Sequence, residues 1–171
     1  MLKKLLIFLF CLLLSIPSST SLPHQQEIIP ADEFSSDVIN ETPIGTLWIP
    51  RISLKQSFYD KNSSENTIEK HVSVLKESSS PSQENSLLLL AAHSGTGNIA
   101  YFEELDQIEI GDSIEIVYEG KTYSYLVSSI WEEEKNGYIH IPNEEGRKLV
   151  LTTCSPKKKN YQLILYCLED I

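Results

Sequence analysis

The sequence predicts a mainly β domain, either an antiparallel barrel or a β-sandwich. Short apolar or alternating runs recur from about residue 43 onward, and such runs are typical of strands. Turn residues separate these runs at short intervals, which favours a barrel or sandwich over a layered α/β fold. With the first twenty or so residues set apart, the 171-residue chain has the length for one hydrophobic core.

The first half of this region contains two predicted strands and one predicted helix. Residues 44–50 have an extended pattern that ends in proline, as at a strand end or on an edge strand. Residues 66–76 place three apolar side chains at helical spacing, which predicts a short helix. Residues 86–92 are almost continuously apolar, which predicts a strand buried on both faces.

The second half contains a predicted hairpin. Residues 98–105 predict one or two helical turns that pack aromatic side chains on the sheet. Residues 113–127 alternate on both sides of Glu119 and Gly120, which predicts a hairpin that turns there. We interpret the acidic run at 132–134 as a solvated loop and residues 137–141 as a further short strand. Two apolar strands then close the chain.

The N-terminal residues predict export. Residues 1–22 combine a basic start, an apolar run and small polar residues, which is the pattern of a cleaved signal peptide or an uncleaved signal anchor. Residues 23–42 are polar and have no sustained period, which predicts a linker. The predicted organisation is therefore an export segment, a linker and one domain over residues 43–171, located at the cell surface or elsewhere in the cell envelope.

Composition argues against nucleic acid as a partner. The formal net charge is −10 and the sequence pI is about 4.8, whereas a general nucleic-acid binder needs clustered Lys and Arg to neutralise phosphates. The only basic run, residues 157–159, directly follows Cys154 and its serine and proline neighbours. It predicts a loop beside an active site or a solvated turn.

No metal or other cofactor is expected. The four histidines are scattered without the spacing of metal ligands. Export would leave Cys154 and Cys167 in an oxidising compartment, where paired cysteines often form a disulfide. A bridge between them requires neighbouring strands in a fitting register, so two free thiols are the favoured prediction.

Cys154 and His93 are the candidate catalytic residues, because each ends an apolar run. A thiol with the reference pKa of about 8.5 is only a few per cent thiolate at neutral pH. A nearby imidazole that holds the proton makes the sulfur more reactive, so the two residues predict a cysteine nucleophile and its acid–base partner. A histidine that only completes a strand end is the alternative.

Five short motifs follow one another in a recognisable order. They are Ile44-Gly45-x-Leu47-x-Ile49-Pro50, Ala91-Ala92-His93-Ser94-Gly95, Tyr101-Phe102-x-x-Leu105, Ile110-Gly111-Asp112-x-Ile114 and Leu151-x-Thr153-Cys154-x-Pro156. Together they resemble the sortases, the cysteine transpeptidases of Gram-positive cell surfaces, over nearly the whole predicted domain. The resemblance implies a closed β-barrel of about eight strands with short helices.

The resemblance also implies an activity and its partners. A sortase cleaves the C-terminal sorting signal of a surface protein or pilin at a threonine carbonyl and forms a thioester, here on Cys154. The acyl group then passes to an amine of a peptidoglycan precursor or of a pilin. An uncleaved N-terminal segment would hold the enzyme in the membrane.

One position departs from the family pattern. Sortases carry an arginine at the start of the strand after the cysteine, where it holds substrate and stabilises the oxyanion. Gln162 best matches that position, and no arginine follows Cys154. The Gln162 amide can donate a neutral hydrogen bond, but loss of one oxyanion donor costs about 10²–10³ in rate in other enzymes.

Two further residues are candidates for substrate contacts, and two alternatives to a transpeptidase remain. Lys159 would substitute in part for the arginine as a point charge. Thr153 would position the nucleophile or the substrate backbone, or serve only as a β-branched strand residue. The alternatives are a sortase-fold protein that binds sorting-signal peptides without turnover, and a thiol hydrolase or peptidase that passes the acyl group to water.

Overall fold

Eight strands and two short 3-10 helices make up the part of the chain that the structure describes. The computed structural model describes residues 41–171, so the predicted export segment and nearly all of the predicted linker lie outside it. The elements are β1 (Gly45–Ile49), η2 (Pro50–Ile52), β2 (Leu54–Phe58), β3 (Ser73–Val74), β4 (Leu87–Ala91), η3 (Leu105–Gln107), β5 (Ser113–Tyr118), β6 (Lys121–Glu134), β7 (Lys148–Cys154) and β8 (Tyr161–Glu169). Within residues 41–171, no helix has both the length and the apolar character to cross a membrane.

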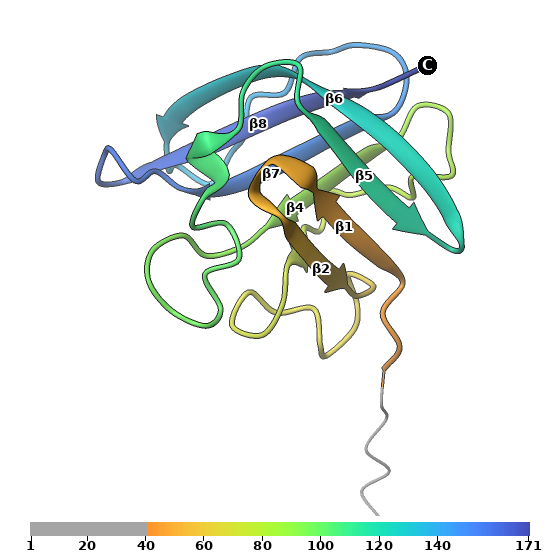
Figure 1. The fold of residues 1–171 in the computed structure, drawn as a ribbon, viewed down its shortest axis with the longest axis horizontal. Helices are drawn as coiled ribbons and strands as arrows, with labels where there is room; N and C mark the ends of the chain where they lie inside the picture. The colour runs from red at the N-terminus through yellow and green to blue at the C-terminus, as the bar shows by residue number, and fades with distance from the viewer. Residues whose placement is uncertain (1–40) are drawn as a thin grey trace, which may run out of the picture. The chain divides into compact units, whose positions relative to one another are not determined.

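The strands form one sheet that curls into a nearly closed barrel (Figure 1). The strand order is β2-β1-β5-β6-β8-β7-β4-β3, and one bridge between Phe58 and Val72 joins the two ends of this order. The mainly β class and the eight-stranded barrel are therefore confirmed. Neighbouring strands are antiparallel except β4 and β7, which run parallel, so the expectation of a wholly antiparallel sheet is wrong at this pair.

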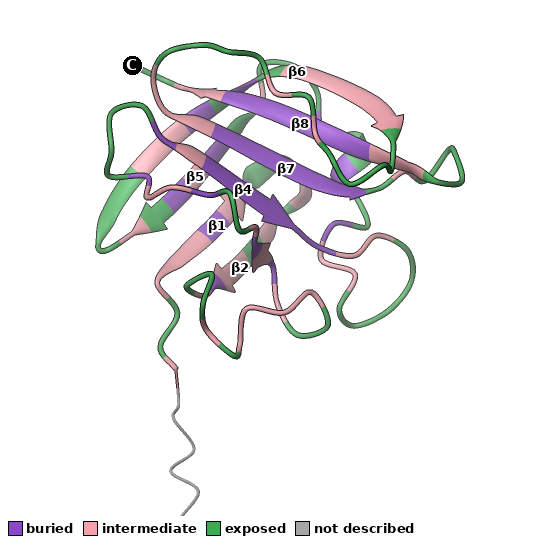
Figure 2. Cartoon of the chain, turned by 180° about the vertical axis from the view of Figure 1, so that it is seen from behind, coloured by how far each residue is buried: buried purple, intermediate pink, exposed green. Residues whose placement is uncertain are grey.

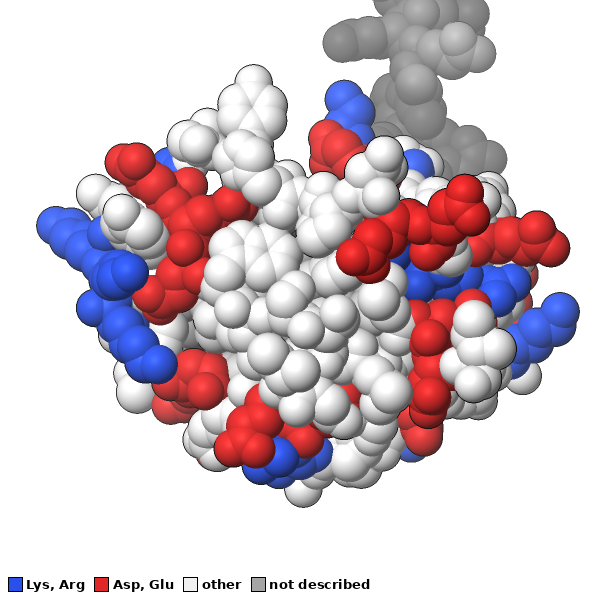
Figure 3. Space-filling view, turned by 90° about the horizontal axis from the view of Figure 1, so that it is seen from above, with Lys and Arg blue, Asp and Glu red and all other residues white. Residues whose placement is uncertain are grey.

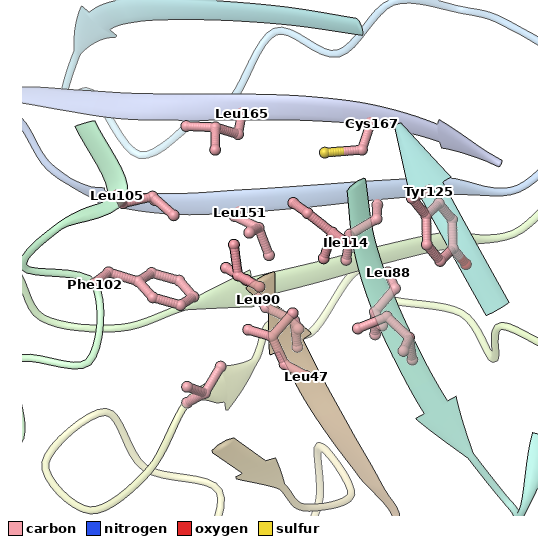
Figure 4. Close-up of a cluster of buried hydrophobic side chains, with 14 of the residues drawn as sticks. Leu47, Leu88, Leu90, Phe102, Leu105, Ile114, Tyr125, Leu151, Leu165 and Cys167 are labelled. Carbon is pink, nitrogen blue, oxygen red and sulfur yellow. The ribbon is translucent and has the colours of Figure 1, made fainter. Parts of the chain in front are cut away.

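The central strands are buried on both faces. Alternate side chains of β4, β7 and β8 fill the barrel interior together with Phe102 and Tyr125 (Figure 4). The intervening side chains form a second cluster on the outer face: Leu89, Val150, Ile164 and Tyr166. Figure 2 shows the resulting burial along the middle of β4, β7 and β8. The continuous apolar run at 86–92 thus forms the doubly buried strand that the sequence predicts.

The predicted hairpin and first strand are present. β5 and β6 pair in register around Glu119 and Gly120, whose φ angles of 49° and 76° are those of a tight hairpin turn. Gly45 begins β1 where the strand needs a residue without a side chain. A Cβ there would overlap the Phe58 ring and lie 2.7 Å from the Val117 carbonyl oxygen.

The helix predicted over residues 66–76 is wrong. This segment consists of turns followed by β3. Val72 and Val74 alternate into the core, a period of two instead of 3.6. The Asn66 side chain replaces a strand partner, since its amide donates to the Val74 carbonyl and its oxygen accepts from the Val74 N–H, at 2.9 and 2.7 Å.

Three other local predictions are changed. Residues 98–105 form turns that lead into η3 instead of regular α-helix, although Phe102 is fully buried as the aromatic packing predicts. The acidic run 132–134 is the end of β6 and is not a solvated loop. Residues 137–141 are not a strand, since their backbone does not pair with the sheet. Their apolar side chains pack on the outer-face cluster.

Charged side chains are dispersed on the face shown in Figure 3. Acidic groups and scattered Lys and Arg side chains surround an uncharged centre there. Basic charge is therefore not concentrated on this face, in keeping with the net charge of −10.

Candidate active site

The parallel pair β4 and β7 brings the two candidate catalytic residues together. Cys154 is the last residue of β7, and His93 follows the end of β4 by two residues. Ala91 lies opposite Thr152 in the register of this pair. Because parallel strands end at the same edge of a sheet, the thiol and the imidazole reach one edge from positions far apart in the sequence.

Both residues line one open pocket of about 310 Å³ on the outer face of the sheet. Cys154 and Val150 are four residues apart on β7, so their side chains point to the same face of the sheet. Val150 belongs to the outer-face cluster. The loop between β6 and β7, residues 135–147, supplies Tyr138 and Ile139 to the pocket wall. The pocket lining thus combines apolar side chains of this loop with the thiol of Cys154 and the imidazole of His93.

Two side chains join the ends of β4 and β7. Thr153 is buried and its hydroxyl donates to the Ala92 carbonyl at 2.7 Å. The Ser94 hydroxyl donates to the Cys154 carbonyl at 2.9 Å. These bonds position the backbone on both sides of the pocket. The roles of Thr153 in positioning the nucleophile and in contacting substrate both stay predictions.

Lys135 contacts the sulfur, and the sequence reasoning missed it. Its Nζ lies 3.1 Å from Cys154 Sγ. Lys135 follows β6 directly, and its backbone N–H donates to the Asn160 carbonyl at the start of β8 at 2.8 Å. A lysine after an acidic run gives no local signal of a catalytic role, since its partner depends on the pairing of β6 with β8.

Gln162 is the second residue of β8, the strand after the cysteine, and it lies directly opposite Cys154 in the register of β7 and β8. On its other side it pairs with Glu133 of β6, so the three residues form one row across three strands. The Gln162 amide nitrogen donates to the Tyr138 carbonyl at 2.9 Å and to Glu133 Oε1 at 3.2 Å. Both amide hydrogens are therefore used to hold the loop after β6, and neither is directed at the thiol.

Glu133 is the centre of this small network. Desolvation acts to raise the pKa of its carboxyl group, but hydrogen bonds from the His140 ring and backbone, with a further contribution from Trp131, lower the pKa overall. The His140 Nδ1 lies 2.9 Å from Glu133 Oε2. A carboxylate that is ionised in the folded state therefore anchors residues 138–140 over the site.

The loop after Cys154 is held by the neighbouring glutamate. The Ser155 hydroxyl donates to Glu132 and lowers the pKa of that carboxyl group, with a smaller contribution from Lys158. Lys159 is exposed on this turn, and among the contacts of residues 41–171 none joins it to Cys154. Its role as a partial substitute for the arginine stays a prediction, while Lys135 occupies the position beside the sulfur.

Both described cysteines are free. Cys154 pairs with Gln162 and Cys167 with Leu149, which separates the thiols by five residues along the strands, or about 17 Å. They also lie on opposite faces of the sheet. Burial raises the pKa of the Cys167 thiol, so this thiol is held neutral in the core.

The arrangement supplies the parts for acyl transfer on a sulfur nucleophile. Cys154 is exposed, His93 lines the same pocket without a hydrogen bond to the sulfur, and Lys135 supplies a positive charge. Within residues 41–171, no three His, Cys, Asp or Glu side chains come together as a metal site.

Comparison with known proteins agrees with this geometry. A sortase domain model matches residues 47–169. Among solved structures, sortase C1 of Streptococcus agalactiae in complex with MTSET matches with a TM-score of 0.67 and 26% identity over 77% of this chain and 71% of that chain. Sortase C of Streptococcus pneumoniae matches with a TM-score of 0.66 and 26% identity over 75% and 68%.

A third match supports the fold alone, because its identity is lower. Sortase A from Corynebacterium diphtheriae matches with a TM-score of 0.64 and 24% identity, over 77% of this chain and 62% of that chain. None of the proteins with curated descriptions matches this sequence. The sortase model covers well over half of the chain and the barrel carries Cys154 and His93 at one edge, so this chain belongs to the sortase family of cysteine transpeptidases.

Proposed function

We propose that this protein is an active sortase that cleaves a C-terminal sorting signal and transfers the acyl group to an amine. The observation that carries the proposal is the convergence of Cys154 and His93 on one open pocket. Membership of the sortase family supports the reaction class. The surface protein or pilin that is cleaved and the amine that accepts it belong to the proposal.

The first half of the reaction forms a thioester. The Cys154 thiolate attacks the carbonyl carbon of the scissile peptide bond, and the electron pair moves to the carbonyl oxygen. The carbon–nitrogen bond then breaks as His93, in its protonated form, gives a proton to the leaving nitrogen. The products are an acyl group on sulfur, a free amine from the departing segment and a neutral His93.

The second half transfers the acyl group. An incoming amine, from a peptidoglycan precursor or a pilin, attacks the thioester carbon and loses a proton to His93. The carbon–sulfur bond breaks, the thiolate is regenerated and a new amide bond forms. The thioester keeps the acyl group reactive toward amines, which suits a transferase that must discriminate against water.

The location is also part of the proposal. Residues 1–22 carry an export pattern, and the partners of a sortase lie outside the cytoplasm. The protein would therefore act at the cell surface or in the cell envelope, with the N-terminal segment as a membrane anchor if it is not cleaved.

The test is mass spectrometry of the purified protein after incubation with peptides that contain candidate sorting signals. The expected result is an acyl adduct on Cys154 that disappears when an amine such as triglycine is added, with a ligated product in its place. The Cys154→Ala variant is the matched control and should give neither adduct nor product.

Two outcomes would replace the proposal with one of its alternatives. An adduct that is released only by water, at the same rate with and without amine, would identify a thiol hydrolase. No adduct across the peptide set, with Cys154 shown to be free by alkylation, would favour a peptide-binding protein. The use of both Gln162 amide hydrogens by Tyr138 and Glu133 is the observation that favours this binding role.

A further inference from the structure

We propose that Lys135 is a catalytic residue of this site, which stabilises the thiolate of Cys154 and then the oxyanion that forms on the attacked carbonyl. The thiolate step concerns the free protein, and only the oxyanion step rests on the proposed acyl transfer. The central observation is the distance of 3.1 Å between Lys135 Nζ and Cys154 Sγ. A cation at this distance favours the charged form of a thiol.

The position of Lys135 is determined by the sheet. Strands β6, β8 and β7 are neighbours in that order, and Glu133, Gln162 and Cys154 lie in one row across them. Lys135 follows Glu133 by two residues, so its side chain starts from the same face. Its backbone N–H is bound to the Asn160 carbonyl, which fixes the start of the side chain whose ammonium contacts the sulfur.

The other charged groups around the thiol leave Lys135 as its direct partner. His93 comes from the end of β4 and lines the pocket without bonding to the sulfur. Glu133 is occupied by His140 and Gln162. Beyond the thiol, Glu132 accepts from Ser155 and lies 3.5 Å from Lys158. The neighbouring carboxylates are thus already paired, and the ammonium of Lys135 is available to the sulfur.

The ammonium of Lys135 also lies close to the place where negative charge develops in the transition state of acylation. When the sulfur attacks a carbonyl carbon, the carbonyl oxygen gains negative charge. This oxygen and the sulfur are then bonded to the same carbon atom. A donor that contacts the sulfur in the free protein needs only a small shift to contact this oxygen. Lys135 therefore supplies the positive charge that Gln162 cannot supply, since Gln162 is neutral and its amide hydrogens bond to the loop.

The first experiment measures the thiolate without any substrate. The full-length protein is alkylated with iodoacetamide over a range of pH, and modification of Cys154 is followed by peptide mapping. We expect Lys135→Met to slow alkylation at pH 7 about threefold to tenfold and to move the rate profile to higher pH. Lys135→Arg, which keeps the charge, should restore most of the rate.

Two controls separate this effect from other causes. Lys157→Met removes a positive charge from the exposed turn after Cys154 and should change the rate less than twofold, because it removes no contact with the sulfur. Cys167 is buried, so its alkylation reports unfolding and should stay negligible in every variant. If the rate of Cys154 alkylation depends on pH in the same way in the natural protein and in Lys135→Met, Lys135 does not stabilise the thiolate and this part of the proposal is overturned.

The second experiment tests the oxyanion step and requires a peptide that acylates the natural protein. Lys135→Met should slow acylation by a larger factor than it slows alkylation, because the variant loses stabilisation of both charges. Equal factors would overturn the oxyanion step. If no peptide acylates the natural protein while alkylation still depends on Lys135, the acyl-transfer proposal fails and the contact of Lys135 with the thiolate stands.

Discussion

Cys154 and Cys167 lie on neighbouring strands of one barrel, yet their surroundings oppose each other. Cys154 ends β7 on the outer face, is exposed and contacts the ammonium of Lys135. Cys167 points into the apolar interior of the barrel, beside Leu165 and near Tyr125 (Figure 4), where burial raises the pKa of its thiol. The position in the sheet, and not the residue type, therefore separates the candidate nucleophile from a packing residue.

This contrast follows from strand alternation. Odd-numbered residues of β7 and β8 point inward and even-numbered residues point outward. On the outer face, the β6–β7 loop forms part of the wall of the pocket at the edge where Cys154 lies, and the thiol stays exposed there. A barrel can in this way combine a rigid interior with a reactive group a few residues away.

The same substitution at the two cysteines is expected to give opposite results, and this is the largest effect. Cys154→Ser should abolish the acyl adduct and change the free energy of unfolding by less than about 0.5 kcal/mol, because the site is exposed. Cys167→Ser should retain the adduct and lower the free energy of unfolding by about 1–3 kcal/mol, because it buries a hydroxyl among apolar side chains. Urea unfolding and the adduct assay measure both quantities. If Cys167→Ser protein is still folded but forms no adduct, the assignment of Cys167 to packing alone is contradicted.

Removal of the Gln162 side chain should loosen the outer face without disturbing the interior. Gln162→Ala loses the bonds to Tyr138 and Glu133, so amide exchange in residues 136–141 should accelerate and acylation should slow by about tenfold. Gln107→Ala is the matched control, since the Gln107 amide bonds only to exposed Glu104. Unchanged exchange in Gln162→Ala would show that the tether does not hold the loop.

Two adjacent threonines of β7 allow a test of the bond between the strand ends. The Thr153 hydroxyl donates to the Ala92 carbonyl, whereas the buried Thr152 hydroxyl has no partner within residues 41–171. Thr153→Val should therefore lower the free energy of unfolding by about 1–3 kcal/mol. Thr152→Val should leave the free energy of unfolding unchanged or raise it. Similar losses for both variants would contradict the assigned role of the Thr153 bond.

The smallest expected effect is a pH dependence at Glu133. Its pKa is lower in the folded protein than the ordinary value of 4.5, so its stabilising contribution is complete above about pH 4.5 and is lost as the pH falls through the folded-state pKa. The Tm of the natural protein should thus exceed that of Glu133→Gln at neutral pH, and the difference should shrink in acid. A constant difference from pH 7 to pH 3 would exclude the ionised carboxylate as its source.

Patterns with a short period predicted the fold well. The β5–β6 hairpin, the doubly buried β4 and the strand that ends at Cys154 follow from alternation, turn residues and continuous apolar runs. The helix predicted over 66–76 was wrong because three apolar residues fit a helical spacing as well as a short strand after turns. The acidic run 132–134 was misassigned because its partners, Ser155 and Gln162, lie on segments that only the folded sheet brings near.

The sequence by itself determined the mainly β class and the five family motifs, because each strand pattern and each motif depends on residues that are close along the chain. The resemblance carried by these motifs then implied the barrel and supported Cys154 and His93 as candidate catalytic residues. Only the tertiary structure decided that β4 and β7 run parallel and deliver His93 and Cys154 to one edge. It also decided that Gln162 holds a loop and that Lys135 contacts the thiol. These relations depend on the order and register of β6, β8 and β7, and long-range pairing of this kind leaves no trace in the local pattern of any one strand.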